Sequence, residues 1–139
     1  MIYLVYISSA TKLFTEAELL DLLQKARANN ERDGITGMLL YSNGNFIQVI
    51  EGEETAVSSL HKRILSDPRH TRIITLLQRP LTKRMFAEWS MGFRNLDLTS
   101  EERPAGFTHF LSEPDALTPI SAKGEIVYKL LLNFRETMR

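Results

Sequence analysis

The chain has 139 residues, of which 43% are hydrophobic, so it is long enough for one domain with a single buried core. Its 17 basic and 17 acidic residues cancel, which leaves no overall charge to attract nucleic acid or an anionic membrane. The lack of any cysteine excludes disulfides, cysteine-ligated metal centres, thiol nucleophiles and thioether-linked cofactors.

The first predicted element is a strand over residues 2–8, where aliphatic and aromatic side chains form a nearly continuous run. Such a run is typical of a central strand that is covered on both faces. The period of two assigns Leu4, Tyr6 and Ser8 to one face, and Tyr3, Val5 and Ile7 to the other.

A helix is predicted next, because Thr15 and Glu18 fit a capping box at its N-terminus. Gly34 is expected to end it. One stripe at helical spacing contains Leu19, Leu22, Leu23, Ala26 and Asn30. The stripe is apolar until Asn30, which we therefore expect at the rim of the surface that the helix covers.

A β-hairpin is predicted from strands over residues 36–42 and 45–51, because Asn43 and Gly44 form a strong turn signal between them. The second strand places Phe46, Gln48 and Ile50 on one face, and Ile47, Val49 and Glu51 on the other. An amide thus shares a face with two large apolar side chains.

A second helix is expected after Gly52, where two glutamates suit the positive end of the helix dipole. Its inner face contains Val57, Leu60, His61 and Ile64. It should end near Asp67 and Pro68, because proline cannot continue a helix.

Two further strands are predicted over residues 72–78 and 86–94, around a turn that contains Pro80. One face of the last strand contains Ala87, Trp89, Met91 and Phe93. From about residue 95 the chain is predicted to be a loop that ends in an amphipathic helix over about residues 124–138. The apolar stripe of that helix contains Val127, Leu130, Leu131, Phe134 and Met138.

This order of elements predicts an α+β fold, a ferredoxin-like βαββαββ mixed five-stranded sheet with two helices on one face and a C-terminal helical tail. In this topology the first and third strands are central neighbours, so Tyr6 and Gln48 can lie side by side. The tail is the only segment left to cover the helix-free face of the sheet.

Three polar residues, Tyr6, Asn30 and Gln48, are predicted to face the apolar interior between the helices and the sheet. A buried amide must be hydrogen-bonded or it costs roughly 1–3 kcal/mol. Gln48 is therefore either a structural amide at an irregularity of the sheet or a functional group. Tyr6 alone would be a core tyrosine with a satisfied hydroxyl.

The remaining candidates also have plain interpretations. Trp89 and Met91 on one strand face are typical of core packing. Arg63 and Asp67 have the i,i+4 spacing of a surface ion pair, and His70 would ordinarily be solvated. The three histidines lack the short spacings of metal ligands, so no metal site is predicted.

All these positions together resemble one family, the BLUF (blue light using flavin) domains. The matching segments are Tyr6–Ser8, Asn29–Asn30, Ile35–Tyr41, Gly44–Gly52, Ile64–His70 and Arg84–Met91. The most specific are Gly-x-Phe-x-Gln-x-x-Glu-Gly and Trp-Ser-Met. The similarity covers about residues 2–96, so we expect a flavin-binding domain over residues 1–96. A C-terminal loop and helix over residues 97–139 would pack on the sheet or mediate output, as in small stand-alone members without a catalytic output domain.

The family binds FAD noncovalently, so the resemblance implies FAD, with FMN as the alternative, held between the two helices over the sheet. It implies that Tyr6 is the photochemical electron donor and that Gln48 lies between Tyr6 and the flavin. Asn30 would bond to the flavin carbonyl edge, and Trp89 and Met91 would respond to the state of Gln48.

The resemblance also predicts the wider lining of the flavin site. The predicted cofactor-binding residues are Tyr6, Leu22, Asn29, Asn30, Phe46, Gln48, Arg63, Ile64, Asp67 and His70. Of these, Arg63, Asp67 and His70 correspond to positions near the ribityl and phosphate end.

The function implied is that of a bacterial blue-light photoreceptor, not an enzyme, that signals through its last strand and tail to a protein partner. We also expect a homo-oligomer, with neither nucleic acid nor membrane as partner. No apolar run approaches the ~18 residues that span a bilayer. The N-terminus also lacks the layout of a signal peptide, so a cytoplasmic protein is expected.

Other classes are weighed against this one. A small ferredoxin-like enzyme of the acylphosphatase type would need an anion-binding loop after the first strand, and residues 8–11 lack the glycines expected there. An RNA-binding sheet is disfavoured by the neutral charge and the lack of a stacked-aromatic signature. A LOV-type flavin photosensor requires a cysteine for its adduct, and the chain has none.

Overall fold

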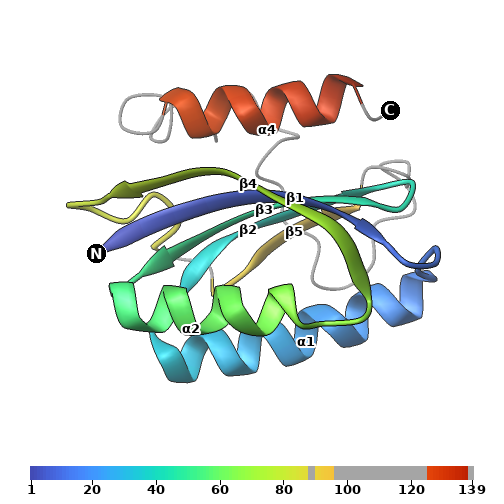
Figure 1. Ribbon diagram of the computed structural model, residues 1–139, viewed down its shortest axis with the longest axis horizontal. Coiled ribbons are helices and arrows are strands. Elements are labelled where there is room, and N and C mark those ends of the chain that lie inside the picture. Colours follow the sequence, from blue (N-terminus) through green and yellow to red (C-terminus); the bar gives the residue numbers. More distant parts are fainter. Residues whose placement is uncertain (88–89, 96–124, 138–139) are drawn as a thin grey trace.

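The computed structural model describes residues 1–87, 90–95 and 125–137 (Figure 1). Its strands are β1 (Ile2–Ala10), β2 (Thr36–Ser42), β3 (Asn45–Gly52), β4 (His70–Pro80) and β5 (Gly92–Asn95). Its helices are α1 (Glu16–Asp33), α2 (Glu54–Leu65) and α4 (Glu125–Thr137). The elements follow one another in the predicted order, with the tail helix last.

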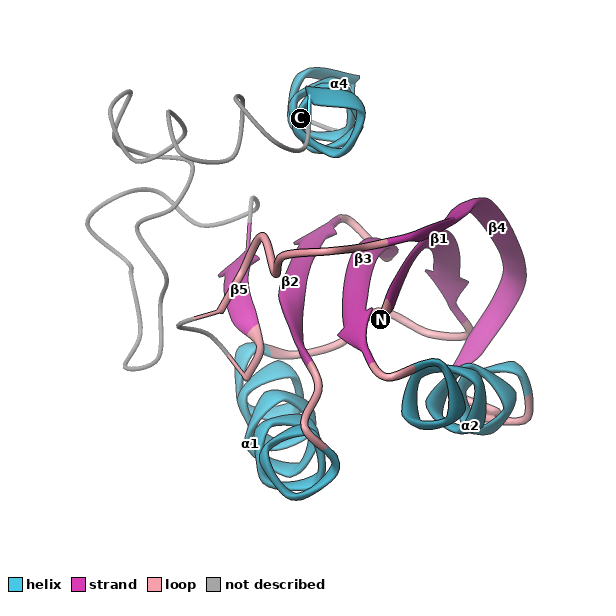
Figure 2. Cartoon of the chain, turned by 90° about the vertical axis from the view of Figure 1, so that its left-hand side faces the viewer, coloured by secondary structure: helices cyan, strands magenta, loops and turns pink. Residues whose placement is uncertain are grey.

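The strands form one mixed five-stranded sheet in the order β4-β1-β3-β2-β5. β5 runs parallel to β2, whereas the other neighbours are antiparallel. Helices α1 and α2 cover one face of the sheet, and α4 lies over the other (Figures 1 and 2). The predicted ferredoxin-like α+β fold is confirmed, and the tail helix does cover the face without α1 and α2.

The central strands β1 and β3 pair in antiparallel register without a shift, and Tyr6 lies directly opposite Gln48. The prediction that these two residues are neighbours is therefore confirmed. On its other side, β1 pairs with β4 less regularly. The register shifts between Val5 and Tyr6 and again between Ile7 and Ser9, as at β-bulges.

Two apolar clusters, one on each face, hold the sheet between its helices. The cluster under α1 and α2 includes Leu4, Tyr6, Leu19, Leu23, Leu39, Tyr41, Phe46, Ile50 and Val57. The cluster under α4 includes Val5, Met38, Leu40, Ile47, Val49, Phe86, Val127, Leu131 and Phe134. The alternation predicted for the first and third strands is confirmed, and β3 is buried on both faces.

Local signals in the sequence explain where α1 and the hairpin begin and end. Thr15 Oγ1 accepts a hydrogen bond from the N–H of Glu18 at 3.1 Å, and Glu18 Oε1 accepts one from the N–H of Thr15 at 3.0 Å. Gly34 ends α1 in the left-handed conformation, with φ of 69°. Asn43 and Gly44 also have positive φ, 45° and 84°, which the tight turn of the hairpin requires.

The strand predicted over residues 86–94 begins too early, because β5 starts only at Gly92 and none of the described residues among 86–91 belongs to a strand. The backbone N–H groups of Met85 and Phe86 donate to the carboxylate of Glu51 at 2.9 and 2.7 Å, which makes them unavailable for a ladder with β2. Phe86 is buried under α4, whereas Ala87 is exposed. Ala87 therefore does not share the buried face of Met91 and Phe93, and Trp89, also predicted on this face, lies outside the described residues.

The other boundaries differ less. Pro80, predicted in a turn, is the last residue of β4. In α4 the predicted stripe is buried at Val127, Leu131 and Phe134, whereas Met138 lies outside the described residues. Within the described part of the chain, no helix is long and apolar enough to cross a membrane.

Candidate functional site

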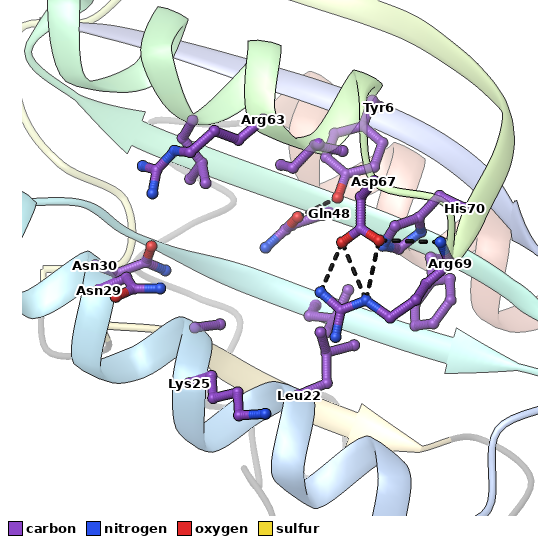
Figure 3. A pocket seen from close by; sticks show the side chains of 15 residues that line it. Tyr6, Leu22, Lys25, Asn29, Asn30, Gln48, Arg63, Asp67, Arg69 and His70 are labelled. Atoms are coloured by element: carbon purple, nitrogen blue, oxygen red, sulfur yellow. Dashed lines mark hydrogen bonds and ion pairs between the residues drawn. The ribbon is translucent and has the colours of Figure 1, made fainter.

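A cavity of about 230 Å³ lies between α1, α2 and the sheet (Figure 3). Its walls are made by the inner faces of both helices, by β1, β2 and β3, and by the segment that joins α2 to the first residue of β4. Every residue predicted to bind the cofactor lines it: Tyr6, Leu22, Asn29, Asn30, Phe46, Gln48, Arg63, Ile64, Asp67 and His70. The structure thus brings the predicted set together, and their role in binding stays a prediction.

The deepest polar groups of the site form a chain from β1 through β3 to the residue before β5. The hydroxyl of Tyr6 donates to Gln48 Oε1, and Gln48 Nε2 donates to the sulfur of Met91 at 3.4 Å. Tyr6 and Met91 are each 1% exposed and Gln48 is 7% exposed. Met91 therefore contacts Gln48 directly, whereas Trp89, predicted alongside it, lies outside the described residues.

The phenol of Tyr6 is held in its neutral form. Burial raises its pKa well above the usual range, and the negative charge of Asp67 raises it further. Because the hydroxyl keeps its proton, Tyr6 can donate it along the bond to Gln48.

Helix α1 contacts the backbone at Ser90 and Met91, just before β5. Asn30 Nδ2 donates to the carbonyl of Ser90 at 2.9 Å, and Arg27 Nε donates to the carbonyl of Met91 at 2.9 Å. Asn30 ends the apolar stripe of α1 as predicted, but it is only 2% exposed, deeper than a rim position. The backbone beside Met91 is therefore attached to the helix that bounds the cavity.

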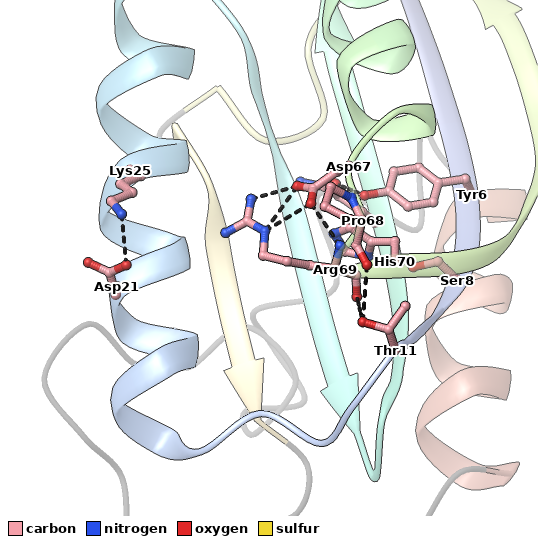
Figure 4. A network of polar contacts seen from close by, with 10 residues as sticks. Tyr6, Ser8, Thr11, Asp21, Lys25, Asp67, Pro68, Arg69 and His70 are labelled. Carbon is pink, nitrogen blue, oxygen red and sulfur yellow. Dashed lines mark hydrogen bonds and ion pairs between the residues drawn. The ribbon is translucent and has the colours of Figure 1, made fainter.

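The charged end of the cavity is organised around Asp67 (Figure 4). Arg69 donates to this carboxylate through Nε at 3.0 Å and through Nη2 at 2.6 Å, which holds the pKa of Asp67 below its usual range. Arg63 instead pairs with Asp33, with 3.4 Å between Nη2 of the arginine and Oδ2 of the aspartate. The predicted Arg63–Asp67 ion pair is therefore wrong, because α2 ends at Leu65 and helical spacing does not continue to Asp67.

His70 was expected to be solvated, but it is partly buried beside Asp67 and Arg69 in the wall of the cavity. Its Nδ1 lies 3.2 Å from Ser8 Oγ, and its ring centre lies 5.1 Å from that of Phe46. Desolvation lowers the pKa of His70 and Arg69 lowers it further, although Asp67 acts in the opposite direction. The imidazole is therefore neutral at neutral pH.

Five lining residues were not among the predicted binders: Lys25, Ala26, Leu39, Leu60 and Arg69. Helical spacing from Leu22 would have found Lys25 and Ala26. Leu39 pairs with Gln48 in the β2–β3 ladder, so the hairpin register would have found it. Among the described residues, no group of three His, Cys, Asp or Glu side chains could hold a metal ion.

Comparison with known families gives a match over most of the described sheet and both covering helices. The family described as "BLUF: Sensors of blue-light using FAD" matches residues 1–92. The photoactivated adenylate cyclase subunit beta of Euglena gracilis is 40% identical over 89 residues, which is 63% of this chain and 10% of that protein. The chain thus spans about a tenth of the length of this curated relative.

Solved structures give the same picture. The dark-state structure of BlrB, a BLUF protein, superposes with a TM-score of 0.70 at 28% identity and covers 98% of this chain and 96% of that one. The BlrP1 of Klebsiella pneumoniae, solved with FMN and cyclic diGMP, has a TM-score of 0.77 at 29% identity. That match covers 98% of this chain and 34% of BlrP1.

Proposed function

The chain belongs to the BLUF family, the sensors of blue light that use FAD, and from this premise we propose that it is a photoreceptor whose switch is Gln48. The cavity between α1 and α2 is the flavin site. The light response consists of a rearrangement of the hydrogen bonds that join Tyr6, Gln48 and Met91.

BLUF domains bind a flavin, and the residues of the cavity suit one. Apolar side chains, among them Leu22, Phe46 and Ile64, provide surfaces for a planar aromatic ring. Two buried polar atoms remain for its polar edge. The second hydrogen of Gln48 Nε2 and the Oδ1 of Asn30 have no hydrogen-bond partner among the described residues.

Cationic side chains favour FAD or FMN over an uncharged flavin. Lys25 and Arg63 line the cavity, and each is exposed enough to meet a phosphate in water. FAD is the cofactor named for the family, so we assign FAD here. FMN, which is present in the BlrP1 structure, remains the alternative.

When bound, the flavin absorbs blue light and in its excited state becomes a strong oxidant. Tyr6 is the most easily oxidised side chain among the described residues that line the cavity. If Tyr6 loses an electron, its phenol proton would move along its hydrogen bond to Gln48 Oε1, because a phenol cation is costly in this buried position.

Gln48 can change partners because its amide carries both donors and acceptors. In the structure its oxygen accepts from Tyr6 and its nitrogen donates to the sulfur of Met91. A thioether is a weak acceptor, so little is lost when Gln48 gives up this bond. A rotated or tautomerised amide would present different groups to Tyr6, to Met91 and to the cavity.

The observation that carries this proposal is the buried Tyr6–Gln48–Met91 chain at the wall of a cavity of suitable chemistry. The test is the absorption spectrum of the purified protein. We expect a yellow protein whose flavin absorption shifts under blue light and returns in the dark. A colourless protein that takes up no added flavin, or a bound flavin without a reversible shift, would overturn the proposal.

We assign sensing to residues 1–96 and output to residues 97–139, with a protein as the receiver of the signal. The segment at Ser90 and Met91 leads directly into β5, and α4 packs on the far face of the same sheet. A cytoplasmic location and a homo-oligomer belong to this proposal as well.

The Euglena relatives are named as adenylate cyclase subunits, and we do not assign cyclase activity to this chain. The Euglena cyclase subunit matches over a tenth of its length, in the part that resembles a BLUF domain. We therefore propose a sensor without catalytic activity of its own. The acylphosphatase alternative has no support from the family match.

A further inference from the structure

Glu51 is a buried carboxylate that the proposed photochemistry does not use. It is 0% exposed and lies on β3, where the alternation of side chains directs it to the face opposite Gln48. A carboxylate in such a position is costly unless hydrogen bonds compensate for the lost water.

The hydrogen bonds of Glu51 come mainly from the backbone that connects β4 to β5. Oε1 accepts from the N–H of Phe86 at 2.7 Å and from Thr36 Oγ1 at 2.8 Å. Oε2 accepts from the N–H of Met85 at 2.9 Å. One side chain therefore attaches two successive backbone groups of this connection to β3.

Arg84 strengthens the same attachment from the other side. Its guanidinium donates to Thr36 Oγ1 at 2.9 Å, to the backbone oxygen of Glu51 at 3.3 Å and to the carbonyl of Gly34 at 2.7 Å. Because Thr36 receives a bond from Arg84 and donates one to Glu51, the positive charge reaches the carboxylate through this hydroxyl.

The middle and the end of the connection contact different parts of the molecule. In its middle, Phe86 is 1% exposed and packs in the cluster that contains Val127, Leu131 and Phe134 of α4. At its end, Met91 contacts Gln48. A displacement that begins at Met91 thus has a short covalent route to the surface on which α4 rests.

We propose that Glu51 is a positioning residue that couples the light-sensing cavity to α4. Its bonds to Met85 and Phe86 hold the middle of the connection to β3, so that a rearrangement at Met91 acts on the packing around Phe86. Without these bonds the backbone near residue 85 would absorb the movement. The inference rests on the proposed function, since it needs a light-driven change at Gln48.

The test follows α4 and the flavin in the same full-length, flavin-loaded sample. The chain has no cysteine, so the Ile126→Cys substitution, at a side chain that is 50% exposed on α4, gives a single site for a nitroxide label. Label mobility is measured in the dark and under blue light, together with the absorption shift. We expect both to respond in the labelled protein without further substitutions.

The deciding variant is Glu51→Gln. Its amide nitrogen cannot accept a hydrogen bond, so one of the backbone N–H groups of Met85 and Phe86 loses its acceptor. We expect a normal absorption shift and a loss of most of the light-dependent change in label mobility, because the two sites are then uncoupled. The control is Glu18→Gln, the same chemical change at the exposed capping box of α1, and it should leave both responses intact.

Thr36→Val removes the hydroxyl between Arg84 and Glu51 without removing the carboxylate, and should reduce the label response in part. If Glu51→Gln does not fold, Thr36→Val tests the coupling role by the same two measurements, the absorption shift and the change in label mobility. A full change in label mobility in the folded variants would overturn the coupling role. The same conclusion would follow if, in the labelled protein without further substitutions, the absorption shifts under light but the label mobility does not change. A labelled protein without an absorption shift would instead overturn the proposed function itself.

Discussion

The amide of Gln48 donates to the sulfur of Met91, 3.4 Å away, while its oxygen accepts from Tyr6. The two bonds are unequal, because a phenol is a strong donor and a thioether is a weak acceptor. Gln48 is thus held firmly on one side and loosely on the other. Such a residue can be well ordered in the dark and still change orientation at small cost.

Replacing Gln48 should abolish the light response without abolishing the fold. Leucine nearly matches glutamine in volume, so the packing cost of Gln48→Leu should stay below about 1.5 kcal/mol. The hydroxyl of Tyr6 loses its acceptor, which adds about 1–3 kcal/mol. We expect a folded, yellow protein whose light-minus-dark difference spectrum is flat.

Two companion variants separate the switch from the packing. Tyr6→Phe should also give a flat difference spectrum, because it removes the hydroxyl but keeps the ring. The double variant Tyr6→Phe with Gln48→Leu leaves no buried hydroxyl unpaired, so urea should unfold it later than Gln48→Leu alone. A normal, reversible absorption shift in Gln48→Leu would remove the switch role from this residue.

Asn30→Ala should weaken flavin binding. The substitution removes a buried amide that lines the cavity and frees the carbonyl of Ser90, so the loss should be about 1–2 kcal/mol, or roughly 5–30-fold in Kd. Titration of apoprotein with flavin, followed by fluorescence quenching, measures it. Asn29→Ala is the matched comparison, since this neighbour is exposed and should lose less. Unchanged affinity and spectrum in Asn30→Ala would exclude Asn30 from the site.

Met91→Leu should lengthen the life of the light state. Leucine preserves the apolar packing but removes the sulfur that accepts from Gln48 in the dark arrangement. The lost bond contributes about 0.5 kcal/mol, and because it must re-form as the barrier to the dark state is crossed, the return should slow about twofold. The recovery of absorption after a blue pulse tests this, and a faster recovery would show that the sulfur stabilises the light state instead.

Acidification should destabilise the protein through His70. Its pKa is lowered in the folded state, mainly by desolvation, whereas the unfolded chain takes up the proton near its usual value of about 6.5. The unfolded state therefore binds more protons, and stability falls as the pH drops from about 7 toward 5. Asp67, whose pKa is lowered by Arg69, loses its contribution only below about pH 4.

Urea unfolding at several pH values measures this dependence. In the variant His70→Asn the slope between pH 7 and 5 should flatten, while the loss of stability below pH 4 should persist. An equal slope in both proteins would mean that another group causes the acid sensitivity.

Much of the fold was predictable because its signals are local. Three signals each act over a few residues: the capping box at Thr15, the left-handed Gly34 and the Asn43–Gly44 turn. The helix and the hairpin whose ends they mark were both predicted. The alternation along the first and third strands gave the two faces of the sheet for the same reason. Once these strands were paired, the contact of Tyr6 with Gln48 followed.

What was missed depends on partners that are distant in sequence. Residues 86–91 have the composition of a strand, but Glu51, 35 positions before Phe86, takes their first backbone donors. The pairing of Arg69 with Asp67 needed the end of α2 to be known first. The cavity set itself was predicted from a family resemblance, because helical and strand periods alone do not show which helix faces which strand.

The two pairings of β1 differ in how they would accept a change in chain length. Between β1 and β3 the ladder has no shift, so one residue inserted or deleted there would turn either Tyr6 or Gln48 to the opposite face. Between β1 and β4 the ladder already contains irregularities on both sides of Tyr6, where an extra residue can be accommodated. The edge strand β4 can therefore change in length, whereas β1 and β3 cannot without separating Tyr6 from Gln48.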